Sequence, residues 1–384
     1  MTDMQADIHH LATVIGARPP LSQEADAAAD YVFERLQKIG VETWREPFFS
    51  PHSTWQQIQP QIALGLIGLA LTTRGKSWVR QLGLPLIGLA VWGGKQTLDG
   101  QSAWWEFIVP EQRAENVLGR IPAQEETRHR VVLIAHLDTE KVRFSAQPIV
   151  RQLMTVEPVR ALQHLMIWGA TLPVHKSWRW MRRLIRLAMI SVSLLMGLDR
   201  LSDYSDGAND NASGVAVLLS LAEQLALHPL PYTEVIFAFT TSDTVNGRGS
   251  AELAANHLKE WQDAYWIVLD SVGSGEVCWV KENISEQPEY SVVHYVEAAA
   301  QKHRADGIMG RTLAVLNPSR PLLAHHLNAV AIMGYDRADN VPVGWHRAED
   351  SIAIINQETL EKTKRFVQTI IQIINEQAPE KVQV

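Results

Sequence analysis

Near-continuous apolar runs of strand length alternate with helical patterns along most of the chain. The strand-like runs are RVVLIAHLD (130–138), EVIFAFTT (234–241), YWIVLDSV (265–272) and AVAIMGYD (329–336). The helical patterns lie at 23–39, 213–226, 290–303 and 357–377. Uninterrupted apolar strands are typical of sheets that are covered on both faces. The pattern therefore predicts an α/β fold, a three-layer sandwich whose central sheet is mostly parallel (mixed) and carries helices on both faces.

Two apolar segments in the first third of the chain nearly repeat one another. They read IALGLIGLAL (62–71) and LGLPLIGLAVWGG (82–94). Residues 64–71 and 84–91 are identical at six of eight positions. We expect a helical hairpin with two similar arms, inserted at 58–96 into a single α/β domain that spans 1–384.

A third apolar segment, LAMISVSLLMGL (187–198), follows a basic and aromatic stretch. In residues 175–186, five Lys or Arg interleave with Trp178 and Trp180. This predicts a second helical insertion at 141–203, and the pattern is typical of an anchor at a membrane interface. A membrane surface is thus an expected partner of 58–96 and 175–198. Since each apolar run has only 10 to 13 residues and a bilayer span needs about 20, helices buried against the rest of the protein are the alternative.

Composition narrows the classes of function. The chain has 384 residues and a formal net charge of −7, so no nucleic acid is expected as a partner. Cys278 is the only cysteine, so a metal site would have to use His, Asp and Glu. The first residues, MTDMQADIHH, lack the basic start and apolar centre of a secretory signal. We therefore expect a membrane-associated or cytoplasmic location.

Residue types that bind metals stand where the predicted strands end. His136 and Asp138 close the first strand, Asp270 closes a later one, and a GANDNASG loop (207–214) precedes a helix. Sites in such sheets gather at the carboxyl ends of the strands. A zinc-bound imidazole also needs its second nitrogen held by a carboxylate or carbonyl, which gives the His-x-Asp pair a chemical reason, although Asp138 could equally be a capping residue.

Several segments resemble the zinc aminopeptidase family, which includes bacterial leucyl aminopeptidases and the glutamate carboxypeptidase of animals. They are VVLIAHLDT, YSDGANDNASGVAVLLSLAEQL, EVIFAFTTSDTVNGRGS, YWIVLDSVG and WHRAEDSIAIIN, in the family's order and spacing. The resemblance covers most of the chain outside 58–100 and 141–203, and it implies a zinc-exopeptidase-like fold.

The resemblance also implies roles for individual residues. In that family two zinc ions share a bridging Asp, which matches Asp210. One ion would also take His136 and Asp270, and the other would take a Glu and a late His that matches His346. Asp138 matches the carboxylate that orients the first His. An exposed loop histidine is the alternative for His346.

The segment TTSDTVNGRGS departs from the family pattern. Members of the family have two consecutive Glu before a Gly-rich turn; the first is the general base and the second is a ligand of the second zinc. Counting back from Gly249 and Ser250 places Asp243 at the base position and Thr244 at the ligand position. Sliding by one residue gives Ser242 and Asp243 instead. In either register one carboxylate remains for two roles, so one tight zinc ion is expected and a second site is doubtful.

These features suggest a zinc-dependent metallo-exopeptidase of the aminopeptidase type, a hydrolase that releases N-terminal residues of peptides. Its site would be weakened or would hold a single metal, with Asp243 as the base. The alternative is a catalytically inactive, membrane-associated binding protein on the same scaffold. A third hypothesis is a single-zinc acyl-transfer enzyme on the same scaffold. It is less favoured, because such a site would also require the carboxylate that is lost from the Glu-Glu pair.

Overall fold

The chain forms two compact units in the computed structural model, which describes residues 4–73, 76–99, 101–153, 158–172, 175–281 and 292–377. The first, the sheet unit, consists of Met1–Ser50, Arg113–Glu140 and Tyr204–Val384. The second, the helical unit, consists of Pro51–Gln112 and Lys141–Asp203. Two separate insertions into the sheet unit thus build the helical unit.

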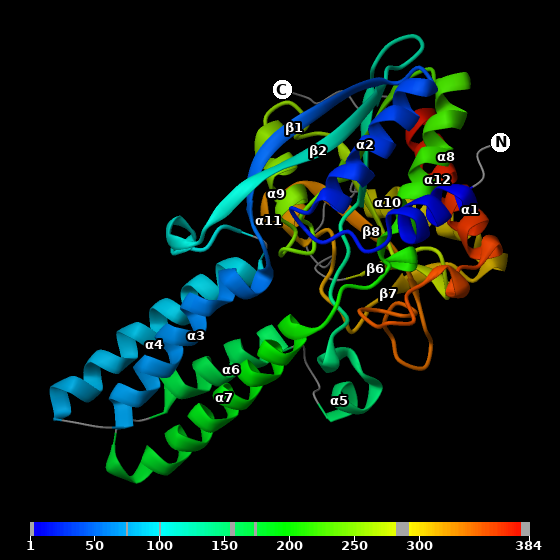
Figure 1. Cartoon of the computed structure of the whole chain (residues 1–384). Helices are drawn as coiled ribbons and strands as arrows, with labels where there is room; N and C mark the ends of the chain where they lie inside the picture. The colour runs from blue at the N-terminus through cyan, green and yellow to red at the C-terminus, as the bar shows by residue number, and fades with distance from the viewer. Residues whose placement is uncertain are drawn as a thin grey trace. The chain divides into compact units, whose positions relative to one another are not determined.

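The described part of the sheet unit contains one mixed sheet of eight strands. They are β1 (Glu42–Pro51), β2 (Glu111–Ile121), β3 (His129–His136), β4 (Thr233–Thr240), β5 (Tyr265–Asp270), β6 (Glu276–Val280), β7 (Met309–Arg311) and β8 (Asn328–Tyr335). Their order across the sheet is β1-β2-β4-β3-β5-β8-β6-β7, and β1 and β2 run side by side in Figure 1. Strands β4, β3, β5 and β8 are mutually parallel, whereas β2 and β6 pair antiparallel with β4 and β8. The predicted fold class, a mostly parallel mixed sheet, is confirmed.

Helices cover both faces of this sheet, which explains why its central strands are apolar throughout. In β3, Val131 and Leu133 pack into one core while Val132 and Ile134 pack into the other. Residues of α1 (Met4–His9), α2 (Gln23–Lys38), α8 (Gly214–Leu227), α10 (Val292–Lys302) and α12 (Gln357–Glu376) complete the first core. Residues of α9 (Arg248–His257) and α11 (Arg320–Ala324) complete the second. The sheet unit therefore has three layers.

The helical unit contains α3 (Thr54–Thr73), α4 (Ser77–Leu98), α5 (Pro148–Leu153), α6 (Pro158–Thr171) and α7 (Arg179–Leu201). Helix α3 packs on α4 and α7, and α6 packs on the same two helices, so the four run alongside one another (Figure 1). The two repeated apolar segments lie in α3 and α4, and the third lies in α7. Among the described helices, none is both long and apolar enough to cross a membrane.

Candidate metal centre

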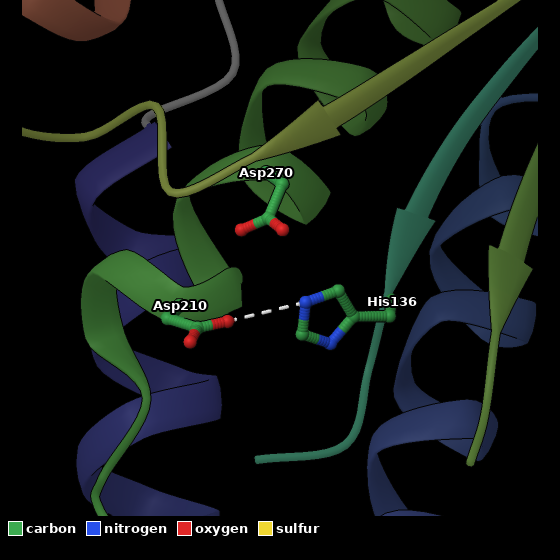
Figure 2. A group of neighbouring side chains, drawn as sticks. All are labelled: His136, Asp210 and Asp270. Atoms are coloured by element: carbon green, nitrogen blue, oxygen red, sulfur yellow. Dashed lines mark ion pairs between the residues drawn. The ribbon is translucent and has the colours of Figure 1, made fainter. Parts of the chain in front are cut away.

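Side chains from two neighbouring strands and one loop converge at the carboxyl edge of the sheet. His136 is the last residue of β3, and Asp270 is the last residue of β5, its parallel neighbour. Asp210 lies in the turn that leads into α8. One potential ligand atom from each of the three lies within 4.8 Å of the others. Figure 2 shows the three side chains directed toward one another.

Asp210 lies between two histidines, with one carboxylate oxygen toward each. Its Oδ1 is 3.2 Å from Nε2 of His136, and its Oδ2 is 3.5 Å from Nε2 of His346. The late histidine of the sequence motif therefore joins the cluster, although it is more than 130 residues away from Asp210 in the chain. This is the arrangement expected of a carboxylate that can bridge two neighbouring cation positions.

The donor set fits one zinc ion. Two ligand atoms of a tetrahedral zinc, each about 2.0–2.1 Å from the metal, lie roughly 3.3 Å apart. The 3.2 Å separation of His136 Nε2 and Asp210 Oδ1 matches this spacing. With Asp270 the site has three protein donors, the number that is typical of catalytic zinc.

The second cation position is poorer in donors. Asp210 and His346 face it, but the side chain of Thr244 is directed elsewhere, because its hydroxyl donates to Oδ2 of Asp138 at 2.5 Å. Within the described residues, only the cluster of His136, Asp210 and Asp270 supplies three such donors. The geometry therefore agrees with one strong and one weak position.

Burial of several charged groups gives the site unusual electrostatics. Burial, followed by repulsion from Asp210, raises the pKa of Asp270 to about 6. Burial alone would lower the pKa of His136, but its hydrogen bond to Asp210 and the charge of that carboxylate raise it well above the ordinary value. Acids that are clustered in this way resist ionisation, and a bound cation would favour their ionised forms.

The backbone, rather than a carboxylate, makes the close contact with the second nitrogen of His136. Nδ1 of His136 donates to the carbonyl oxygen of Asp138 at 2.9 Å, whereas Oδ1 of Asp138 is 3.8 Å away. This contact leaves Nε2 as the ligand atom, which faces Asp210. The carboxylate of Asp138 instead accepts the N–H groups of Asp243 and Thr244 and the Thr244 hydroxyl.

Asp243, the residue at the base position of the motif, is held by three donors. Its carboxylate accepts hydrogen bonds from the Thr240 hydroxyl at 2.6 Å, the Ser250 N–H at 2.7 Å and the Ser250 hydroxyl at 2.6 Å. These contacts tie the loop after β4 to the start of α9. The role of Asp243 as a base stays a prediction.

Two residues that position the site were not predicted from the sequence. Asp350 accepts the N–H groups of Asn209 and Asp210 at 2.6 and 3.2 Å, so it fixes the turn that carries the bridging carboxylate. Arg18 is fully buried and donates to the carbonyls of Leu137 and Gly207, which flank the cluster. Asp350 stands four residues after His346, the one sequence signal that could have indicated it; we find no such signal for Arg18.

Three comparisons with known proteins bear on this site. Residues 191–371 match the model of peptidase family M28. No curated protein sequence matches the chain. Three similar solved structures are a zinc-dependent exopeptidase from Parabacteroides distasonis, a glutaminyl cyclase from Tannerella forsythia and a zinc aminopeptidase from Bacillus subtilis.

These structures agree with the chain over nearly its whole length. The exopeptidase has a TM-score of 0.58 at 17% identity, covering 97% of each chain. The cyclase has 0.58 at 16%, covering 98% of each. The aminopeptidase has 0.58 at 15%, covering 97% of this chain and 94% of its own. At such identities the likeness establishes the fold. The family match at 191–371 and this shared fold confirm the resemblance to the zinc aminopeptidase family that the sequence motifs indicated.

Proposed function

We propose that the chain is a zinc-dependent exopeptidase that releases N-terminal residues from peptides through one tightly bound metal ion. The observation that carries this proposal is the cluster of His136, Asp210 and Asp270 at the carboxyl edge of the sheet. The family match and the fold shared with a zinc exopeptidase and a zinc aminopeptidase support it. In such folds the carboxyl edge is where substrates bind.

The backbone around the cluster is strained in the way that functional sites often are. Ser242, Ser271 and His346 have φ values of 57°, 55° and 51°, in the left-handed region that residues other than glycine rarely adopt. Ser242 precedes Asp243, and Ser271 follows Asp270. Each of these residues holds its turn at a cost in backbone energy.

The residues divide the chemistry between them. When bound, zinc supplies Lewis acidity: it polarises a substrate carbonyl and makes water acidic enough to react near neutral pH. His136, Asp210 and Asp270 would hold the ion. His346 lies beside the other oxygen of Asp210, where it can contact the substrate or hold a weaker ion. Asp243 would accept the proton of the attacking water through Oδ1, which accepts one hydrogen bond, from the Ser250 N–H, whereas Oδ2 accepts two.

A second candidate is a non-catalytic binding protein on the same scaffold. The specific observation in its favour is that the side chains of Asp243 and Thr244 both form hydrogen bonds with other residues of the protein. Loss of a general base typically costs about 100- to 10,000-fold in rate. Such a protein would keep the zinc and bind peptides without cleaving them.

Metal content and hydrolysis separate the candidates. We expect elemental analysis to find one tight zinc per chain, which His136→Ala and Asp270→Asn abolish and His294→Ala, at an exposed histidine on α10, does not. A His136→Ala variant that keeps its zinc would contradict the assignment of His136 as a zinc ligand.

We expect the wild type to release amino acids slowly from aminoacyl substrates, and we expect Asp243→Asn to reduce this rate further. Zinc binding with no release would favour the binding protein, and cyclisation of a peptide with N-terminal glutamine would point to the chemistry named for the Tannerella neighbour.

A further inference from the structure

The outer side of α7 carries a stripe of large apolar side chains. Its members, each more than half exposed, are Trp180, Leu184, Leu187, Leu194, Leu198 and Leu201. Their spacing of three, four and seven residues places them on one side of the helix over about 30 Å. The other side of α7, with Ile185 and Met189, is buried in the core of the helical unit. Helix α7 is therefore apolar on two sides, and the described residues cover only one of them.

Neighbouring helices of the unit add further exposed apolar groups. Ile67 of α3, Trp78, Leu82 and Trp92 of α4, and Trp168 of α6 are also more than half exposed. Single exposed apolar residues are ordinary, but so many on one small helical unit are typical of a surface that binds an apolar partner.

The same segments are almost free of acidic residues; the exception is Asp199 near the end of α7, which is buried and accepts hydrogen bonds from Ser145. Residues 54–98 and 158–198 contain neither Asp nor Glu, but four and six Lys or Arg respectively, although the whole chain has a net charge of −7. Most of these basic residues flank the α3–α4 and α6–α7 turns. The ends of α3 and α6 that precede these connections lie at one end of the unit, because Gly169 of α6 packs on Leu69 of α3. We call this end, with exposed Trp78, Trp168 and Trp180, the turn end.

The interior of the unit relies on small and polar residues. Gly68 of α3 and Gly83 of α4 meet so closely that a Cβ on Gly83 would lie 2.4 Å from the Gly68 carbonyl oxygen. Gln61 donates to Gln163 at 2.7 Å, and Gln163 donates to the Val91 carbonyl at 2.7 Å. Glycine contacts and buried interhelical amide bonds are how helices associate in an apolar medium. Apolar groups outside and polar contacts inside together indicate a unit adapted to lipid.

We propose that the turn end and the α7 stripe dock on the surface of an anionic lipid bilayer. The tryptophans and leucines would enter the boundary between headgroups and acyl chains, and the basic side chains would contact the anionic headgroups. Charge complementarity favours this occupant over a second copy of the chain. Pairing two copies through this surface would bring two acid-free, basic surfaces together, which is unfavourable. Docking on one leaflet requires no helix that crosses the membrane.

Flotation of the full chain with vesicles tests the proposal. We expect the protein to float with vesicles of phosphatidylcholine plus phosphatidylglycerol at low salt, to bind pure phosphatidylcholine weakly, and to be released by high salt. A triple variant, Lys76→Gln with Arg183→Gln and Arg186→Gln, should bind roughly 100-fold more weakly, about fivefold for each charge. Exposed basic residues of the sheet unit supply the matched control, Lys302→Gln with Arg304→Gln and Arg365→Gln, which should bind like the wild type.

The apolar contribution has its own pair of variants. Leu187→Gln with Leu194→Gln should weaken binding by about tenfold or more for each leucine. Leu227→Gln with Leu258→Gln, at exposed positions of the sheet unit, should have no effect. Circular dichroism and zinc content show that each variant folds. A wild type that ignores anionic vesicles overturns the proposal, as does binding that survives the leucine pair. It is also overturned if light scattering shows a dimer that the leucine pair makes monomeric while vesicle binding is unchanged.

Discussion

The hydroxyl of Thr244 donates to the carboxylate of Asp138 at 2.5 Å, and the Thr244 N–H donates to the same oxygen at 2.9 Å. Burial raises the pKa of Asp138, while the charge of His136 and these bonds from Thr244 oppose the rise. Residue 244 therefore supports a buried carboxylate behind the site instead of binding a cation. A glutamate at this position could not donate the bond and would have to turn away from Asp138.

Restoring both carboxylates of the family motif should create a second metal position. In Asp243→Glu with Thr244→Glu, residue 244 can add a carboxylate to the oxygen and nitrogen that Asp210 and His346 already supply. We expect the zinc content to rise from one to two per chain and the rate of aminoacyl hydrolysis to increase.

Thr244→Val is the control for that variant, because it removes the hydroxyl and adds no charge. It should keep one zinc and lose about 1 kcal/mol of stability with the hydrogen bond. A double variant that still binds a single zinc would show that the register of TTSDTVNGRGS on the family motif is wrong.

Asp350→Asn should weaken the metal site without removing a ligand. Both oxygens of Asp350 accept backbone N–H groups that fix Asp210, and an amide can keep only one of these contacts well. Loss of such support typically costs about 10- to 100-fold in metal affinity. Titration with a competing chelator measures this loss. Asp263→Asn, at an exposed position, should have no effect, and an unchanged affinity in Asp350→Asn would contradict the positioning role.

The metal-free protein should lose stability as the pH rises from about 4 to about 8. Burial, followed by repulsion from Asp210, raises the pKa of Asp350 to about 8, and the pKa of Asp270 is likewise raised, to about 6. In the unfolded chain both carboxyls titrate near a pKa of about 3.9. Over this interval the folded state keeps protons that the unfolded state releases, so rising pH favours unfolding.

Urea unfolding of chelator-treated protein at several pH values measures this slope. Asp350→Asn carries no titrating group at that position, so its stability should fall less steeply with pH than that of the wild type. Bound zinc should reduce the wild-type slope, because the cation stabilises the ionised carboxylates. Equal slopes for wild type and variant without metal would contradict the prediction.

The sequence was sufficient for the central part of the fold because the buried strands are continuous apolar runs. The run at 130–138 corresponds to β3, and the run at 265–272 corresponds to β5. The outer strands could not be predicted in the same way: β2 begins with exposed charged residues, and β7 has only three residues, so neither has an apolar run.

Some features of the metal site could not be predicted from the sequence, for a different reason. Residues at strand ends could be predicted to converge, since the sheet geometry brings β3 and β5 together. The direction of the Thr244 hydroxyl depends on the fold of the loop after β4, and the role of Asp350 depends on a contact across 140 residues. Neither leaves a periodic pattern in the sequence.

The near-repeat of the two apolar arms allows a last test. Two glycines stand at equivalent positions of the repeat but have different surroundings in the structure. Gly68 and Gly88 occupy the same position in 64–71 and 84–91. A Cβ on Gly68 would lie 2.7 Å from Cγ1 of Ile87 and 2.8 Å from the Gly83 carbonyl oxygen, whereas a Cβ on Gly88 would meet nothing within 4 Å.

Alanine in a helix is favoured over glycine by about 0.5–1 kcal/mol. Gly88→Ala should therefore raise the melting temperature slightly. In Gly68→Ala the forced separation of α3 and α4 costs about 1–3 kcal/mol, which exceeds that gain, so the melting temperature should fall. Equal shifts in the two variants would mean that α3 and α4 do not pack through Gly68 and Gly83.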